Sequence, residues 1–380
     1  MANAGIYLHI PFCKSRCSYC DFATDVFKNN ETVERYVDAL IKEIKMSVPP
    51  ALAGGLEIDT IYFGGGTPSL LAPAQLEKIL DSVHKKFSVL PEIELTMEMN
   101  PATVTLETLK EYRNLGVNRA SFGAQTFDDT ELKRLARGHT AADVRETIKL
   151  LRKANFENVS FDLIAGLPRQ SLEDWERNLD EALKLAPEHL SLYLLEIHEG
   201  TPLAEQIRSR RQPMPDEDLA GEMYELMIEK TSEKGYAQYE ISNFSLPTFE
   251  SKHNSKYWLC EPVFAFGVSA HSFDGKTRRA NERDTQAYVS LVESGKSPVV
   301  SETELTAKQL SGEFAFLNLR MAKGLDLKDY ERRFGIDLFT DMADDLARFS
   351  DLHLIERVED HLRLTRKGMV YSNEVFALFV

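Results

Sequence analysis

Three cysteines near the N-terminus carry the clearest chemical signal of the sequence. Cys13, Cys17 and Cys20 follow a CxxxCxxC spacing, and the whole chain has four cysteines. Where thiols stay reduced, such a cluster indicates a metal site rather than a disulfide framework. A short loop with this spacing can wrap three thiolates around one small metal centre. The spacing therefore predicts that these three cysteines bind metal.

The number of ligands favours iron and sulfur, with zinc as the alternative. Structural zinc sites usually have four protein ligands. No further Cys or His nearby has the spacing of a zinc finger, and His9 is the nearest. Three thiolates can instead hold a [4Fe–4S] cluster whose fourth iron is free for an outside ligand. Cys260 stands alone, and we interpret it as a small buried apolar residue.

Six β-rich runs alternate with helical patterns in the first 200 residues and must position these thiols. The predicted strands cover residues 5–13, 59–66, 94–101, 118–126, 158–168 and 189–197. The predicted helices cover residues 31–46, 74–87, 107–115, 128–135, 141–155 and 173–185. Strands without clean alternation, separated by helices, predict a parallel sheet covered by helices. Either an open doubly wound sheet or a partial barrel fits this order.

Polar residues and glycines recur where these predicted strands end. They are Gly64 to Thr67, Glu98, Gln125, Asp162 and Glu196. The carboxyl ends of parallel strands form the site edge in both architectures. Any one of these residues alone could be a structural polar group at a strand end. Together they predict one shared site.

The pattern changes after residue 200. Residues 201–300 contain a predicted helix at 217–233 and short runs at 237–244 and 264–273, and we interpret them as an extension wrapped on the first 200 residues. Residues 301–380 predict helices at 307–319, 327–334 and 339–349 and a hairpin within 354–365, which resembles a small winged-helix domain. This last segment is acidic, so we expect a packing or partner surface there and not a nucleic-acid site.

Composition restricts the class of protein. Of 380 residues, 43% are hydrophobic, enough for a core, and 45 Lys and Arg against 60 Asp and Glu give a net charge of −15. That charge opposes binding to nucleic acid and to anionic membranes. The N-terminus lacks the basic start and the long apolar stretch of a signal peptide, and no run reaches the roughly 20 apolar residues of a membrane span. We therefore expect a cytoplasmic protein.

The cysteine motif, with Tyr19 directly before its last cysteine, resembles that of the radical S-adenosylmethionine (SAM) superfamily. The glycines of the GGGTP run that begins at Gly64 fit this resemblance. In that superfamily the free iron binds the amino and carboxylate groups of SAM, and an electron from the cluster cleaves SAM to a 5′-deoxyadenosyl radical. The resemblance implies an α/β fold with a partial (β/α)6 TIM-like barrel, followed here by the smaller winged-helix-like domain.

Six further segments narrow the resemblance. YLHIPFC, FGGGTP, EMNP, GAQTF, RLARGH and DLIAGLP are similar to segments of oxygen-independent coproporphyrinogen III dehydrogenases and their HemW-type relatives. By this resemblance, the residues that contact SAM would be Tyr7, Tyr19, Gly65, Gly66, Thr67, Glu98, Gln125, Arg137 and Asp162. Glu98 can accept hydrogen bonds from ribose hydroxyls or an ammonium, Arg137 suits a carboxylate, and Asp162 can accept from hydroxyls or amines.

Two features favour the HemW-type branch. Phe22 stands where the dehydrogenases carry a further cysteine, and residues 253–258 match the HNxxYW motif of that branch. The resemblance implies that His253 contacts haem, for which an imidazole can serve as an axial ligand. A hydrogen-bonded histidine beside two aromatic residues is the plain structural alternative, and Cys260 and His271 are other ligands within reach in the sequence.

The resemblance implies a haem chaperone with a SAM-bound [4Fe–4S] cluster and haem as cargo. Its expected partners are haem-accepting apo-proteins, including membrane-associated respiratory enzymes, and a second copy of the chain. The enzymatic alternative is radical decarboxylation of coproporphyrinogen III to protoporphyrinogen IX. A winged-helix regulator that senses an iron–sulfur cluster is a third alternative, but it leaves the SAM motifs without a role.

Overall fold

The computed structural model describes residues 3–47 and 56–380. The six strands predicted for the first 200 residues form one continuous parallel sheet. They are β1 (Ala4–Ile10), β4 (Ile58–Gly65), β5 (Val89–Met99), β6 (Arg119–Gln125), β7 (Asn158–Ala165) and β8 (His189–Leu194). Six of the helices between them are α1 (Asn30–Met46), α2 (Pro73–Lys86), α3 (Leu106–Asn114), α4 (Asp129–Arg134), α5 (Ala141–Lys153) and α6 (Leu172–Lys184). The prediction of an α/β fold with a partial barrel is confirmed.

Local sequence explains where these helices begin. Asn29, Thr105, Thr140 and Ser171 each precede a helix, and each side chain accepts a hydrogen bond from a backbone N–H of the first turn. Such caps satisfy donors that have no partner within the helix. Strand alternation then separates two faces of the sheet. In β1, Ile6, Leu8 and Ile10 join the hydrophobic core, while Tyr7 and His9 contact each other on the opposite, inner face.

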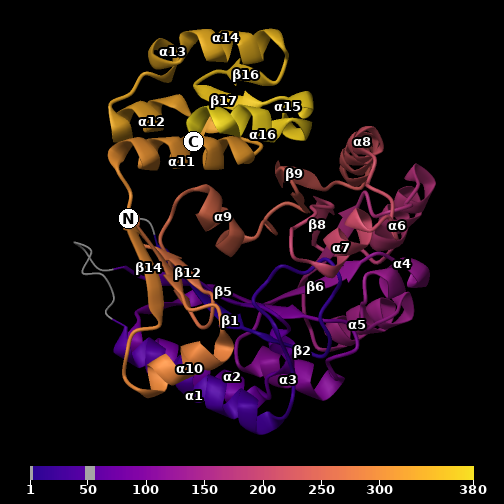
Figure 1. Ribbon diagram of the computed structural model, residues 1–380, viewed down its shortest axis with the longest axis vertical. Coiled ribbons are helices and arrows are strands. Elements are labelled where there is room, and N and C mark those ends of the chain that lie inside the picture. Colours follow the sequence, from indigo (N-terminus) through magenta and orange to yellow (C-terminus); the bar gives the residue numbers. More distant parts are fainter. Residues whose placement is uncertain (1–2, 48–55) are drawn as a thin grey trace.

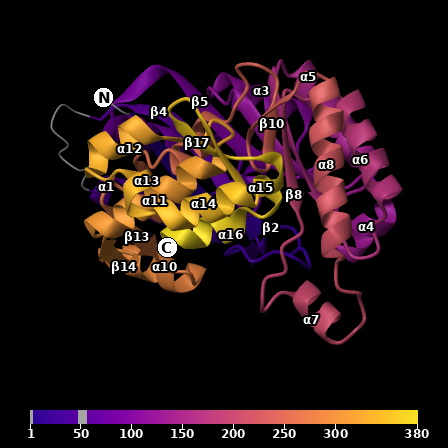
Figure 2. The same ribbon diagram turned by 90° about the horizontal axis from the view of Figure 1, so that it is seen from above.

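Residues 201–300 extend both edges of the sheet. On one edge, β11 (Val263–Phe266) pairs with β1 as a further parallel strand, and β12 (His271–Phe273), β13 (Thr277–Asn281) and β14 (Val299–Glu304) follow it antiparallel. On the other edge, β10 (Asn243–Ser245) and β9 (Ala237–Glu240) continue from β8. The helices of this segment are α7 (Pro202–Arg208), α8 (Glu217–Glu233), α9 (Lys252–Trp258) and α10 (Thr285–Glu293). Figure 2 shows α8 beside α6 along the outside of the sheet, and these two helices are in contact.

The C-terminal residues form a separate small unit. It contains α11 (Ala307–Arg320), α12 (Leu327–Phe334), α13 (Leu338–Asp341), α14 (Ala343–Asp351), α15 (Arg366–Val370) and α16 (Ser372–Phe376) around a sheet of β15 (Leu325–Asp326), β17 (His361–Leu364) and β16 (Ile355–Val358). Figure 1 shows this unit stacked above the large sheet, with α9 between the two, and α9 contacts α11.

One helix prediction in this unit was wrong. The helix predicted over residues 339–349 is two helices, because Met342 has φ −128° and ψ 31° and lies outside the helical region. Among the residues that the structure describes, no helix has the length and apolar character needed to cross a membrane.

Candidate functional site

The three cysteines lie on one closed loop directly after β1. Two short parallel strands, β2 (Phe12–Cys13) and β3 (Asp25–Val26), pair at the base of the loop and bring its ends together. Within the loop, the N–H of Cys20 donates to the carbonyl of Cys17 at 3.3 Å and forms a turn. All three thiols are partly exposed and free. The loop thus presents three reduced thiols close together at the carboxyl end of β1.

Donors from two other segments of the chain approach these thiols. Arg137 Nη1 donates to Cys17 Sγ at 3.3 Å, and Thr67 Oγ1 donates to Cys13 Sγ at 3.6 Å. Arg137 Nη2 is held by the carbonyl of Gly123 at 2.6 Å, while its buried Nε has no partner among the described residues. Donors around sulfur stabilise thiolates, which are the form that binds metal. Arg137 and Thr67, both expected at the SAM site, therefore lie beside the cysteines.

The donor set fits an iron–sulfur cluster better than a single ion. Within residues 3–47 and 56–380, no three His, Cys, Asp or Glu side chains converge tightly enough to hold one metal ion. A [4Fe–4S] cluster requires no such convergence, because each thiolate binds a different iron atom. Cys13, Cys17 and Cys20 would hold the cluster, and Arg137 and Thr67 would donate to their sulfur atoms.

The glycine run at the end of β4 passes very close to the end of β1. Gly66 N donates to the carbonyl of Ile10 at 2.8 Å, and a Cβ at Gly66 would lie 2.7 Å from the carbonyl carbon and oxygen of Pro11. Gly65 has φ +110°, a conformation that other residues rarely adopt. The cluster loop begins directly after Pro11, so these glycines set its position relative to β4.

Replacing Gly66 with alanine should therefore destabilise the protein. Overpacking against a backbone carbonyl typically costs about 1–3 kcal/mol, and here no flexible side chain can yield. The free energy of unfolding, measured by chemical denaturation, should fall by that amount. Gly138→Ala is the matched control, because its nearest neighbour would be a serine hydroxyl at 3.6 Å. Equal stability of the two variants would contradict the steric argument.

Glu98 lies on the inner face of the sheet, at the end of β5. Its carboxylate accepts from Tyr62 Oη at 2.7 Å and from Gly65 N at 3.1 Å. The pKa of Glu98 is raised to about 7, because burial and the charge of the nearby Asp162 outweigh the lowering effect of these two hydrogen bonds. Burial also raises the pKa of Asp162, which the charges of Arg119 and Arg137 oppose. Two carboxyl groups of shifted pKa thus face the same interior, as is common at functional sites.

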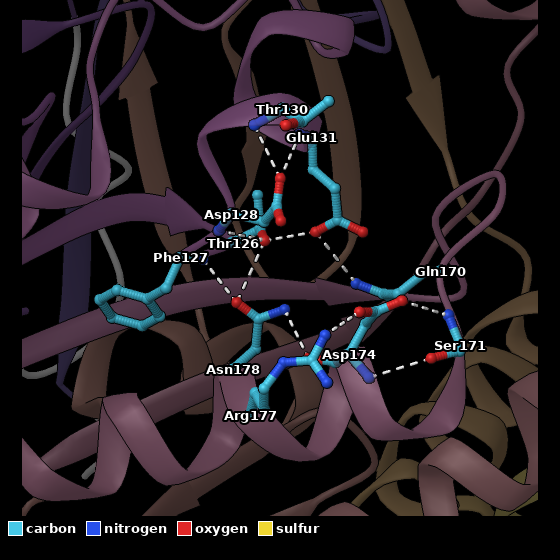
Figure 3. A network of polar contacts seen from close by, with 10 residues as sticks. All are labelled: Thr126, Phe127, Asp128, Thr130, Glu131, Gln170, Ser171, Asp174, Arg177 and Asn178. Carbon is cyan, nitrogen blue, oxygen red and sulfur yellow. Dashed lines mark hydrogen bonds and ion pairs between the residues drawn. The ribbon is translucent and has the colours of Figure 1, made fainter.

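Gln125 is held in a left-handed conformation, with φ +66°, by the segment that follows it. Figure 3 shows this segment: Thr126 and the N–H of Phe127 both contact Asn178 Oδ1 of α6, at 3.1 and 2.5 Å. Thr126 also contacts Glu131 of α4. Because Arg137 follows α4 closely, this buried network fixes two of the expected SAM residues at once.

Tyr7 and Tyr19 occupy different places around this interior. Tyr7 Oη lies 3.1 Å from His9 Nδ1, and its ring stacks on Tyr62 with ring centroids 6.1 Å apart. Tyr19 packs against Leu135 and two other apolar residues, and burial raises the pKa of its hydroxyl while the charge of Arg137 opposes that shift. Tyr7, Glu98 and Tyr62 are therefore in one cluster, and Tyr19 lies with Arg137 and the cysteine loop.

His253 lies on the inner side of the sheet and not at its surface. The side chain is 1% exposed, with Nδ1 2.9 Å from Thr60 Oγ1 and Nε2 3.1 Å from Tyr257 Oη. Its ring stacks on Tyr62 at 5.0 Å between centroids, and its backbone N–H donates to Glu94 at 2.9 Å. Both ring nitrogens are already engaged, so His253 could bind an iron only after one of these contacts breaks.

One residue that we expected at the site, Glu196, does not lie with the others. Glu196 lies beyond the end of β8 with a side chain that is 81% exposed, and it faces His198. The other strand-end residues are buried or half-buried, so the exposed Glu196 is set apart from them. Sequence reasoning also missed Tyr62, which links Glu98 to His253. Its position two residues before Gly64, on the same face of β4, was the available signal.

Comparison with known proteins defines first the class and then the family. Residues 7–182 match the model of the radical SAM superfamily, and residues 305–371 match the HemN C-terminal domain. A radical SAM domain implies a [4Fe–4S] cluster and SAM. The coproporphyrinogen III oxidase HemN from Escherichia coli, a radical SAM enzyme, superposes with a TM-score of 0.86 over 99% of this chain and 90% of that chain, at 24% identity. At that identity the likeness concerns the fold.

Curated relatives are closer in sequence. The heme chaperone HemW of Bacillus subtilis is 36% identical over 98% of both chains. The heme chaperone HemW of E. coli is 31% identical over 99% of this chain and 97% of its own. The chain belongs to the HemW family of radical SAM proteins.

Proposed function

We propose that this chain is a cytoplasmic haem chaperone that binds haem and passes it to apo-proteins, with a SAM-binding [4Fe–4S] cluster of its own. The observation that carries the proposal is the full-length similarity to curated heme chaperones HemW. The HNxxYW motif and Phe22 in place of a further cysteine support it. Respiratory enzymes as acceptors and a homodimer as the working form are parts of the same proposal.

The residues around the cysteine loop are assigned to the cluster and SAM. Cys13, Cys17 and Cys20 hold the cluster, which supplies one-electron chemistry to SAM when bound. The buried Nε of Arg137 has no partner within residues 3–47 and 56–380, and its guanidinium suits the SAM carboxylate. Glu98 and Asp162 accept from its amine or hydroxyl groups. The glycines that begin at Gly65, with Thr67, Gln125, Tyr7 and Tyr19, complete the contacts that we assign to SAM.

The alternative enzyme, a coproporphyrinogen III dehydrogenase, shares the fold of HemN but receives less support. Its structural relative is 24% identical, whereas the curated chaperones reach 36%. Anaerobic incubation with coproporphyrinogen III, SAM and a reductant distinguishes the two. Formation of protoporphyrinogen IX would favour the dehydrogenase, and we expect none.

Haem binding itself is tested by an anaerobic titration followed at the Soret band. Wild type should bind haem saturably. His253→Ala should bind it about tenfold more weakly, since this change removes the imidazole that contacts the hydroxyl of Tyr257 in the same motif. His271→Ala is the control, because His271 is exposed on β12 outside the motif. Absence of saturable binding by the cluster-loaded wild type would contradict the chaperone proposal.

A further inference from the structure

Tyr257 is the more accessible partner of the pair that it forms with His253. It lies one turn after His253 on α9 and is 36% exposed, whereas His253 is 1% exposed. Its hydroxyl lies 3.1 Å from His253 Nε2. The other ring nitrogen of His253 contacts Thr60. The ring lies between Tyr62 and β1, where a Cβ at Gly5 would be 3.1 Å from the imidazole. Of the two side chains, Tyr257 is therefore the one nearer the surface.

The imidazole of His253 is neutral, and in one of its two tautomers it can accept a hydrogen bond from Tyr257. Burial, together with the charges of Lys256 and Arg119, lowers the pKa of His253 to about 3. A neutral imidazole has one N–H donor and one acceptor nitrogen. In the tautomer with the proton on Nδ1, Nδ1–H donates to Thr60 Oγ1 and Nε2 accepts a hydrogen bond from the hydroxyl of Tyr257. This contact polarises the phenol and orients its oxygen.

We propose that Tyr257 binds the haem iron through its phenolate oxygen and that His253 is a positioning residue behind it. The inference rests on the proposed haem-binding function, and it changes which residue of the motif touches the metal. Tyrosinate is an established axial ligand of haem iron. The arrangement also explains why the histidine of the motif is buried with both ring nitrogens engaged.

Binding of the haem iron by Tyr257 releases one proton. On binding ferric haem, the O–H bond of Tyr257 breaks, an O–Fe bond forms, and a proton passes to solvent. The imidazole stays neutral and exchanges tautomers: Nε2–H then donates to the phenolate, and Nδ1 accepts from the hydroxyl of Thr60, which can act as donor or acceptor. Burial, and then Glu98, raise the pKa of Tyr257, so the free phenol keeps its proton until iron binds.

The test is a ferric-haem titration of the cluster-loaded protein, followed by absorption and resonance Raman spectroscopy. Wild type should show a phenolate-to-iron charge-transfer band and phenolate vibrations. Tyr257→Phe should lose both and bind about tenfold or more weakly. His253→Gln should keep the band, with binding weakened by a smaller factor, because its amide can still donate to the phenolate. Tyr371→Phe, at another exposed tyrosine, should behave as wild type.

A different spectrum would overturn the inference while leaving the chaperone proposal intact. That spectrum is imidazole ligation that persists in Tyr257→Phe and disappears in His253→Gln. If wild type shows no saturable haem binding, the proposed function fails, and this inference fails with it. If Tyr257→Phe does not fold, the phenolate vibrations of the wild-type complex, present or absent, decide the question alone.

Discussion

Cys17→Ser is expected to abolish the iron–sulfur cluster. Wild type, reconstituted without oxygen, should hold about four iron atoms per chain with the Mössbauer signature of a [4Fe–4S] cluster. The variant should retain almost none, because two thiols on the loop leave two irons without a protein ligand. Arg137 Nη1, which donates to Cys17 Sγ at 3.3 Å, would also lose its sulfur partner. Iron and sulfide analysis together with Mössbauer spectroscopy measures the effect.

Cys260→Ser is the matched control for that experiment. Cys260 is the only cysteine outside the loop and lies far along the chain from the other three. The control should therefore hold as much iron as wild type. Zinc without iron in wild type, or a cluster that survives in Cys17→Ser, would contradict the assignment.

The sequence predicted the first 200 residues well because local signals define those elements. Capping residues such as Thr140 and Ser171 mark helix starts, and each predicted strand contains enough apolar residues to be recognised. β11 was harder to predict, since it has only four residues and becomes a parallel strand only by pairing with the distant β1. Helix α9 carries no apolar periodicity, because its buried residues are His253 and Lys256.

The site was predictable where it depends on strand ends and not where it depends on long-range packing. Glu98, Gln125 and Asp162 could be expected at one edge because parallel strands align their ends. The burial of His253 could not, because it requires the chain to pass from β10 to β11 and to bring α9 against Thr60 and Tyr62. The sequence alone does not show whether His253 faces the inside or the outside of the sheet, because this depends on the path of the chain between β10 and β11.

The affinity for SAM is expected to increase with pH through the ionisation of Glu98. Its pKa is about 7, so about a tenth of the carboxyl groups are ionised at pH 6 and about nine tenths at pH 8. Only the ionised form accepts from hydroxyl or ammonium donors with both oxygens. Affinity should therefore be about tenfold higher at pH 8 than at pH 6, as measured by calorimetry with the cluster-loaded protein.

Glu98→Gln should bind SAM at every pH about as weakly as wild type does at low pH, and it should therefore lose this dependence. Titration of SAM itself is common to both proteins and cancels in the comparison. Glu107→Gln, at an exposed position at the start of α3, should keep the wild-type profile. A pH dependence that persists in Glu98→Gln would assign the titration to another group.

A variant of the neighbouring Asp162 tests whether Glu98 or Asp162 is the group whose ionisation controls SAM binding. Its charge raises the pKa of Glu98, whereas the charge of Arg119 lowers it. Asp162→Asn removes the like charge, so the midpoint of the SAM profile should move to lower pH while the profile keeps its direction. If Asp162 were instead the group that titrates, this variant would lose the pH dependence and Glu98→Gln would keep it. The two variants therefore give opposite results for the two assignments. The charge of the buried Arg119 acts on both carboxyl groups and does not distinguish them.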